Sequence, residues 1–326
     1  MLFLAINVID FCFALAFKAL SNFRIFAPLK IQPSILSQSR NNLQNWILLS
    51  LLTLIWGSSY ILMKKGLLGF SAIEMACLRI SISFICALPI AIKAFKAVGK
   101  DKYFTLMLIG FISILFPAFL FAFALKKGES AITGILNALS PLWTALIGYY
   151  FFKAIISGRK MLGVAIGFAG AVVLVVGAPG FSLQLDIGYA ALPVIATFCY
   201  GLGTNLTKQQ MQDENPIYTT VISMSFAGIP ALIALFCTAA PAKIATGQVW
   251  LPLAAITALA VFGTFVAWIL FYRLLQRTDM LFATSVTYLV PIVAISWGFL
   301  DGEVLSVLQI GGMFLILTGV YFTTRA

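Results

Sequence analysis

The sequence holds few side chains that could carry out covalent chemistry. Histidine, the usual general base and the commonest metal ligand, is absent, and only ten acidic residues are present. The five cysteines, Cys12, Cys77, Cys86, Cys199 and Cys237, stand singly within apolar segments, a pattern typical of neither a metal site nor a disulfide framework. We therefore expect a protein that is not an enzyme and that binds no metal or other cofactor.

Polar side chains do recur at helical spacing inside four of the apolar segments. Residues three or four positions apart share one face of a helix. The four sets are Thr53, Gly57, Tyr60 and Lys64; Thr133, Asn137, Ser140 and Thr144; Thr197, Gly201, Thr204 and Lys208; and Thr284, Thr287 or Tyr288, and Pro291. Such stripes mark either tight helix packing or the wall of a cavity.

These two interpretations apply to different residues. Packing is preferred for three glycines of one segment, Gly163, Gly167 and Gly170, because small residues let membrane helices approach closely. For four larger polar side chains, a cavity wall and a structural hydrogen bond fit equally well, since such groups gain little from facing lipid. These four are Tyr60, Asn137, Asn205 and Tyr288.

Arg79 is the most specific candidate for binding. It lies about two helical turns into an apolar segment, and an arginine at the bilayer centre costs roughly 2.5–3.5 kcal/mol unless it is paired or hydrated. Glu74 is five residues earlier, roughly 140° around the helix, and is poorly placed as a partner. Three interpretations stay open for Arg79: it binds an anionic group such as a carboxylate, it pairs with helix-end carbonyl groups, or it extends to the nearby membrane surface.

The composition places all these residues in an integral membrane protein. Hydrophobic residues make up 62% of the 326 positions and charged residues 10%, against about half and a quarter in soluble domains. Ten apolar segments are long enough, at ~1.5 Å per residue, to cross a ~30 Å hydrocarbon core as helices. The expected spans of this all-α fold are 46–63, 72–92, 103–125, 131–152, 160–177, 187–206, 216–238, 250–272, 280–299 and 304–323.

The net charge of +11 indicates membrane orientation rather than nucleic-acid binding. The basic residues form short clusters between apolar segments, and most fall in connections on one side of the membrane, which the positive-inside rule assigns to the cytoplasm. The other side holds Lys64, Lys65, Lys126, Lys127 and Lys243. We therefore expect a multi-pass protein in the lipid bilayer, with a cytoplasmic C-terminus and no nucleic-acid partner.

Residues 1–44 form an apolar N-terminal extension ahead of the ten spans. Residues 1–17 are apolar apart from Asn7 and Asp10, and the extension lacks the basic start and small-residue cleavage site of a signal peptide. An eleventh span, an interfacial helix and an upstream start codon stay open.

The chain also contains an internal repeat. The aligned pairs are TLIWGSSYILMK (53–64) with TFCYGLGTNLTK (197–208), and FAFALKKGESAITGILNALSP (121–141) with FYRLLQRTDMLFATSVTYLVP (271–291). Each copy then holds five spans, an odd number, so the second copy enters the membrane from the opposite side. We expect two inverted five-helix repeats over 45–178 and 186–324, with substrate bound between them.

Several motifs resemble the EamA family of the drug/metabolite transporter superfamily. They are WGSSYILMKKGL (56–67), LRISISF (78–84), LNALSPLWTAL (136–146), LGVAIGFAGAVVLVVG (162–177) and LDGEVLSVLQIGGMFLILTGV (300–320). The resemblance covers about residues 46 to 323. In one departure, Gly302 and Glu303 provide the family's Gly-Glu turn in the second repeat, whereas Lys153 stands near the matching place in the first.

The resemblance implies a permease of the bacterial cytoplasmic (inner) membrane that exports amino acids or related small metabolites by alternating access, as a monomer or homodimer. The candidate substrate pathway consists of Trp56, Tyr60, Arg79, Asn137, Tyr200, Asn205 and Tyr288, and the candidates for coupling or gating are Glu74, Pro141 and Pro291. Transport of nucleotide-sugars or lipid-linked head groups is the alternative. A membrane-embedded transferase is less favoured, because histidine is absent and the acids are scattered.

Overall fold

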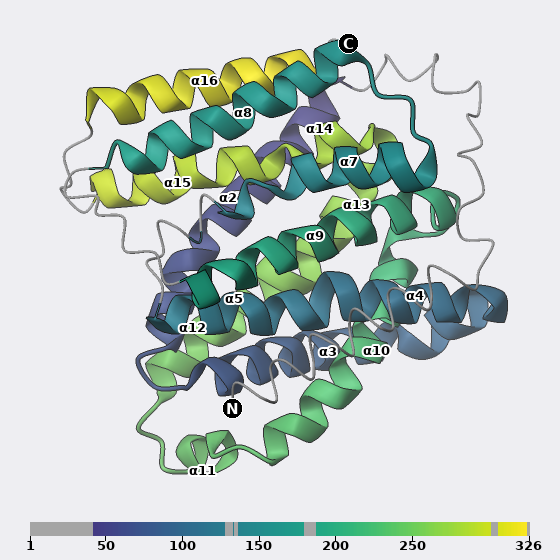
Figure 1. The fold of residues 1–326 in the computed structure, drawn as a ribbon. Helices are drawn as coiled ribbons and strands as arrows, with labels where there is room; N and C mark the ends of the chain where they lie inside the picture. Colours follow the sequence, from purple (N-terminus) through teal and green to yellow (C-terminus); the bar gives the residue numbers. More distant parts are fainter. Residues whose placement is uncertain (1–41, 128–132, 134–135, 179–186, 301–305, 325–326) are drawn as a thin grey trace.

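The computed structural model describes residues 42–127, 133, 136–178, 187–300 and 306–324, and every regular element among them is helical (Figure 1). The elements are α2 (Asn42–Gly66), α3 (Ala72–Ala97), η3 (Lys100–Lys102), α4 (Tyr103–Ile109), η4 (Gly110–Leu115), α5 (Phe116–Lys127), α7 (Ser140–Phe152), α8 (Gly158–Val176), α9 (Ile187–Gln210), α10 (Pro216–Phe236), α11 (Ala240–Ala245), α12 (Trp250–Ala260), η5 (Val261–Val266), α13 (Ala267–Arg277), α14 (Met280–Thr284), α15 (Val286–Leu300) and α16 (Val307–Thr324).

The helices match the predicted membrane spans. Each of the ten expected segments overlaps a helix or a run of consecutive helices. Within the described residues, seven of these are long and apolar enough to cross a bilayer, namely Leu43–Gly66, Ala72–Ala97, Lys100–Leu125, Gly158–Val176, Pro216–Phe236, Trp250–Arg277 and Met280–Trp297. The prediction of an all-helical membrane protein is confirmed, with seven to ten candidate spans. The N-terminal extension, up to residue 41, lies outside the described residues.

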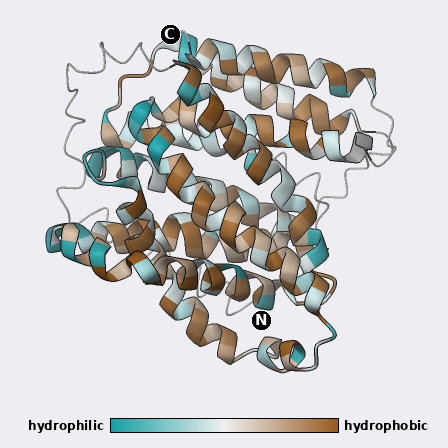
Figure 2. Cartoon of the chain, turned by 180° about the vertical axis from the view of Figure 1, so that it is seen from behind, coloured by the Kyte–Doolittle hydropathy of each residue, from teal (hydrophilic) through white to brown (hydrophobic). Residues whose placement is uncertain are grey.

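The outer surface of the helices suits a lipid environment. Figure 2 shows hydrophobic residues along the sides of the helices and hydrophilic residues mainly toward their ends. Large apolar side chains such as Ile92, Ile233 and Phe314 are exposed there, which a bilayer favours and water does not.

Local sequence signals determine where several helices begin. Ser71 and Glu74 form a capping box at the start of α3, in which each side chain accepts a hydrogen bond from the other residue's backbone N–H. At α14, the Asp279 carboxylate accepts hydrogen bonds from the backbone N–H groups of Leu281 and Phe282, both at 3.0 Å. These caps satisfy helix-end donors that would otherwise lack partners.

The third span of each half contains a short π-helical stretch. In the first half (α2 to α8) this is η4, and in the second half (α9 to α16) it is η5. A π-helix inserts one extra residue per turn and shifts the backbone hydrogen-bond pattern, a change that is frequent at functional sites. The repeat seen in the sequence is therefore matched by an irregularity of the backbone at corresponding places.

Helices of one half pack between helices of the other half. Helix α3 lies against α10, and α8 lies against α16, at opposite edges of the molecule (Figure 1). Between these edges, α2 of the first half packs on α12, α13 and α15 of the second, while α9 of the second half packs on α5 and α7 of the first. Each half thus places its first helix against the helices of the other half.

Glycines allow the closest of these contacts. A Cβ atom at Gly163 would lie 2.8 Å from the backbone O of Gly319, and one at Gly319 would lie 2.4 Å from the backbone N of Gly167. Backbone atoms cannot move aside as a flexible side chain can, so α8 and α16 need glycine at these positions. The predicted packing role of the glycines in α8 is confirmed.

Two ion pairs join the halves at opposite ends of the α3–α10 pair. Near the start of α3, Lys243 of α11 lies 2.7 Å from the carboxylate of Glu74. Beyond the end of α3, Lys102 of η3 pairs with Glu214, which immediately precedes the start of α10. In each pair, a lysine of a short helix in one half contacts an acid at or just before the start of a long helix in the other half.

Candidate functional site

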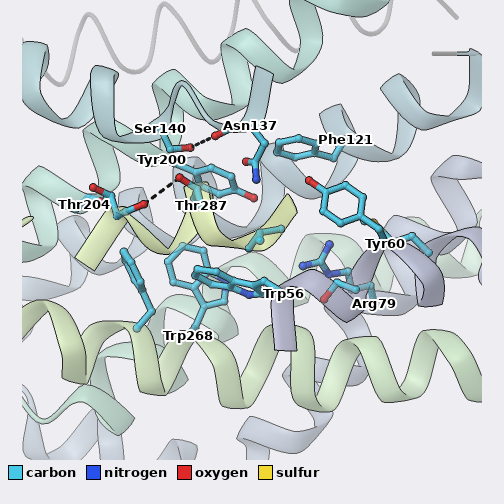
Figure 3. A pocket seen from close by; sticks show the side chains of 15 residues that line it. Trp56, Tyr60, Arg79, Phe121, Asn137, Ser140, Tyr200, Thr204, Trp268 and Thr287 are labelled. Atoms are coloured by element: carbon cyan, nitrogen blue, oxygen red, sulfur yellow. Dashed lines mark hydrogen bonds between the residues drawn. The ribbon is translucent and has the colours of Figure 1, made fainter. Parts of the chain in front are cut away.

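A pocket opens between the two halves, close to the middle of the helices. Its volume is about 100 Å³, several times the roughly 10–15 Å³ that admits a single water molecule. The lining residues are Trp56, Ser59, Tyr60, Met63, Arg79, Phe121, Asn137, Ser140, Tyr200, Thr204, Trp268, Phe271, Thr284, Thr287 and Val290 (Figure 3). They come from α2, α3, α5, α7, α9, α13, α14, α15 and the segment that precedes α7.

The four polar stripes found in the sequence meet at this pocket. Tyr60 represents the stripe of α2, Asn137 and Ser140 that of the segment entering α7, and Thr204 that of α9. Thr284 and Thr287 represent the stripe of α14 and α15. The pocket is therefore built from corresponding helices of both halves, as an inverted repeat predicts.

Arg79 lines the pocket and is held there by the second half. Its Nε donates a 2.7 Å hydrogen bond to Oγ1 of Thr264 in η5. The hydroxyl of Thr264 in turn donates to the carbonyl of Leu259, five residues earlier, at 3.2 Å, the spacing that a π-helix provides. The guanidinium thus reaches the pocket wall, and this geometry differs from the extended one needed to reach the membrane surface.

Ser83 of α3 makes a second contact beside the Arg79–Thr264 hydrogen bond. Its hydroxyl, one turn after Arg79, lies in hydrogen-bond reach of two backbone carbonyls. These are the carbonyl of Ala260, at 2.8 Å, and that of Arg79 in the same helix, at 2.7 Å. Together with Arg79, Ser83 fastens α3 to the start of η5. A side chain of the first half thereby meets a backbone carbonyl near the π-helical stretch of the second.

An aromatic wall encloses the pocket beside Arg79. The indole Nε1 of Trp56 donates a 3.1 Å hydrogen bond to the carbonyl of Gly263, also in η5. The Trp56 ring packs edge-on against Trp268, with centroids 6.2 Å apart, and tilted against Phe271, at 5.6 Å. Tyr200 stacks on Phe121 at 6.0 Å. Such rings give a small solute a large apolar contact and suit an amphipathic ligand.

Five of the seven predicted pathway residues line the pocket, and two do not. Asn205 directs its Nδ2 to the carbonyls of Thr144 and Gly201, at 3.0 and 2.8 Å, and so joins α9 to α7. Tyr288 is fully buried, and its hydroxyl donates to the carbonyl of Val164 in α8, at 3.0 Å. Both side chains make structural hydrogen bonds, one of the two interpretations that the sequence left open.

None of the three coupling and gating candidates is among the lining residues, although Pro141 and Pro291 each follow one, Ser140 and Val290. Glu74 lies at the capped start of α3, bonded to Ser71 and Lys243. Pro141 occupies the first turn of α7, and Pro291 lies inside α15. The segment containing Gly302 and Glu303 lies outside the described residues, and Lys153 ends α7 with a left-handed backbone, at φ 53°.

Six lining residues carried no predicted role in the substrate pathway or a polar stripe. They are Ser59, Met63, Phe121, Trp268, Phe271 and Val290. Ser59 and Met63 lie within the motif WGSSYILMKKGL, whose spacing points them to the face of Trp56. The aromatic residues of α5 and α13 gave no signal, since aromatic side chains in apolar helices also face lipid.

A polar network joins the ends of α9 and α13 outside the pocket lining. The Nζ of Lys208 donates to the carbonyls of Leu275 and Thr278, at 2.8 and 2.7 Å, at the end of α13. The amide of Gln276 donates to the carbonyls of Met211 and Glu214, at 2.9 and 2.6 Å. These contacts tie the ends of α9 and α13 together on the side that the sequence assigns to the cytoplasm.

Comparison with known proteins relates this architecture to a family. The EamA-like transporter family matches residues 44–176 and 187–325. The chain is 26% identical over 292 residues to an uncharacterized transporter of Archaeoglobus fulgidus, covering 87% of this chain and 99% of that protein. It is 26% identical over 282 residues to a protein of Salmonella typhimurium named a probable amino-acid metabolite efflux pump, covering 83% and 91%.

Two further comparisons concern location and fold. The chain is 26% identical over 278 residues to the uncharacterized inner membrane transporter YedA of Escherichia coli, covering 84% of this chain and 88% of that protein. A solved crystal structure aligns with a TM-score of 0.66 and 16% identity, covering 86% of this chain and 97% of that one. At that identity the likeness concerns the fold.

Proposed function

The chain belongs to the EamA-like transporter family, and we propose that it exports amino acids or related small metabolites by alternating access through the pocket between its halves. Membership makes it a multi-pass membrane transporter of small molecules and not an enzyme. The observation that carries the finer proposal is the position of Arg79, a cation fixed in the wall of a small pocket that is otherwise neutral among its described lining residues.

The size and lining of the pocket favour a small amphipathic solute. A carboxylate can bind the Arg79 guanidinium, and the aromatic wall of Trp56, Trp268 and Phe271 can receive an apolar side chain. A nucleotide-sugar carries two phosphates and a much larger body, yet Arg79 is the single basic residue among the described residues that line the pocket. Small carboxylates are therefore preferred as the substrate class.

Other observations support the direction of transport and the orientation of the chain in the membrane. The relative from Salmonella typhimurium is named a probable amino-acid metabolite efflux pump, which favours export. The clustering of basic residues favours a cytoplasmic C-terminus, and the Escherichia coli relative is named an inner membrane transporter. We propose the cytoplasmic membrane of a bacterium as the location.

A resistance screen tests this proposal. Overexpression should protect cells against one or more toxic amino-acid analogues, and Arg79→Gln should abolish that protection while the protein still reaches the membrane. The matched control is Arg273→Gln, which alters an exposed arginine of α13 and should keep protection. Full protection by the Arg79→Gln variant would contradict the role of Arg79, and substrate-dependent uptake into cells with no protection would reverse the direction.

A further inference from the structure

Three hydroxyl groups that line the pocket have their protons already bonded to the protein. Ser140 donates to the carbonyl of Asn137 at 2.9 Å, Thr284 to that of Met280 at 2.8 Å, and Thr287 to that of Thr284 at 2.9 Å. A hydroxyl has one proton and two lone pairs. These three side chains therefore offer a bound solute hydrogen-bond acceptors and no donors.

Pro291 adds to this acceptor character. Proline lacks a backbone N–H, so inside a helix the carbonyl four residues earlier loses its usual partner. Pro291 lies inside α15, and that carbonyl belongs to Thr287, a residue that lines the pocket. A backbone carbonyl without its usual helical donor therefore stands next to the hydroxyl oxygens.

Arg79 provides the opposite chemistry at the other end. Figure 3 shows Arg79 with Tyr60 and Trp56 at one end of the pocket, and Ser140 and Thr287 away from them, beyond Asn137 and Tyr200. Because the Nε of Arg79 is bonded to Thr264, its terminal nitrogens are the donors directed to a solute. The pocket therefore has a donor end with positive charge and an acceptor end.

We infer that the acceptor end, formed by Ser140, Thr284 and Thr287, binds the ammonium group of a zwitterionic amino acid whose carboxylate is bound by Arg79. This inference rests on the proposed function and deepens it, because it assigns a second charged subsite. An ammonium group carries donors and no acceptor, and so matches hydroxyl and carbonyl oxygens. The described lining residues include no acid, so the neutral oxygens are the partners that remain.

This arrangement discriminates three classes of solute. A zwitterion satisfies both ends of the pocket. A carboxylate without an amine leaves the acceptor oxygens without donors, which costs affinity because they have been removed from water. An amine without a carboxylate places its positive charge in a small pocket with Arg79 and no compensating anion. The site therefore selects amino acids over both the corresponding acids and the corresponding amines.

Matched probes test the inference on the purified full-length chain. Binding of L-leucine, 4-methylpentanoate and 3-methylbutan-1-amine is compared by tryptophan fluorescence and thermal shift, as is binding of L-phenylalanine, 3-phenylpropanoate and 2-phenylethylamine. In at least one trio, the amino acid should bind about tenfold or more tightly than either analogue, the effect expected for a hydrogen-bonded charged group.

Variants locate the effect at the acceptor end. Thr287→Val should weaken binding of the amino acid by about tenfold and leave that of its desamino analogue unchanged, while Thr287→Ser, which keeps the hydroxyl, should retain amino-acid binding. The matched control is Thr318→Val, because Thr318 is an exposed residue of α16 whose hydroxyl is bonded to a helix carbonyl in the same way, at 2.8 Å from Phe314. It should bind like the unaltered chain.

The outcomes separate this inference from the proposed function. If the desamino acids bind as tightly as the amino acids, or if Thr287→Val weakens both equally, the ammonium subsite is wrong and export of small carboxylates still stands. If no member of either trio binds and overexpression protects against no amino-acid analogue, both the subsite and the proposed function are wrong.

Discussion

Arg79 of the first half is joined to Thr264 of the second half by a 2.7 Å hydrogen bond. The threonine hydroxyl can accept this bond because its own proton is donated to the carbonyl of Leu259, within the π-helical region. The orientation of Arg79, the one charged side chain among the described residues that line the pocket, therefore depends on a backbone irregularity in the other half. Because substrate binding by Arg79 is part of the proposed function, we propose Thr264 as a positioning residue for that binding.

The first prediction concerns this contact. Thr264→Val removes the acceptor for Arg79 and should weaken carboxylate binding by about tenfold, as measured by fluorescence titration, with Thr264→Ser restoring it. Thr257→Val is the control, since Thr257 is an exposed residue of neighbouring α12 with a helix-bonded hydroxyl. Unchanged affinity in the Thr264→Val protein would show that Arg79 is held in place by its other surroundings.

The second prediction concerns the packing of α8 on α16. Gly319→Ala places a methyl group 2.4 Å from a backbone nitrogen of α8 and should lower stability by roughly 1–3 kcal/mol or more, because neither backbone can move aside without loss of packing. The melting temperature in detergent measures this effect. Gly311→Ala, on the same helix, meets no atom within 4 Å and should melt like the unaltered protein. Equal melting of both variants would contradict the packing role of Gly319.

The third prediction compares Lys208 with Lys64, the residue that the internal repeat aligns with it. Lys208 donates to two carbonyls at the end of α13, whereas its repeat counterpart Lys64 is exposed. Lys208→Gln should cost roughly 2 kcal/mol, the range for hydrogen bonds to a charged group, and Lys64→Gln should cost little. Thermal unfolding of the two variants measures the difference. A comparable loss in both would place the stabilisation elsewhere than in the α9–α13 network.

The fourth prediction separates gating from coupling at Glu74. If the Glu74–Lys243 pair acts as a gate between the halves, Glu74→Gln and Lys243→Gln should change the export rate to the same extent, and the double variant should add nothing. Each variant should also lower stability by roughly 1–3 kcal/mol, since Lys243 is 39% exposed but the Glu74 side chain, at 5%, is buried. If Glu74 instead carries a proton during transport, Glu74→Gln alone should abolish pH-driven export in vesicles while Lys243→Gln keeps it.

Much of the fold and part of the site were predictable from the sequence. Length and hydropathy gave the spans, because lipid leaves helices as the way for these segments to satisfy their backbone. The polar stripes gave Tyr60, Asn137, Ser140, Thr204 and Thr284, since polar groups on one helical face avoid lipid together.

The differences between the predicted pathway residues and the residues that line the pocket follow from the helical period. Thr204 and Thr287 line the pocket, while their neighbours Asn205 and Tyr288 bond to adjacent helices. One residue corresponds to about 100° around a helix, so a small rotation decides which of two neighbours faces the pocket. The rotation of a helix about its axis is set by packing against other helices. That packing cannot be read from the sequence of the helix alone. The positions of η4 and η5, and with them the support of Arg79, depend on the same packing.

The crossed arrangement of α2 and α9 has a consequence for how the molecule assembles. Helix α2 packs on α12, α13 and α15, and α9 packs on α5 and α7. The first helix of each half therefore has its packing partners in the other half, as in a domain-swapped dimer. A chain cut between α8 and α9 would consist of two fragments that are each incomplete and that recover a binding pocket when expressed together. The two halves thus depend on each other as two different subunits would, although they belong to one polypeptide.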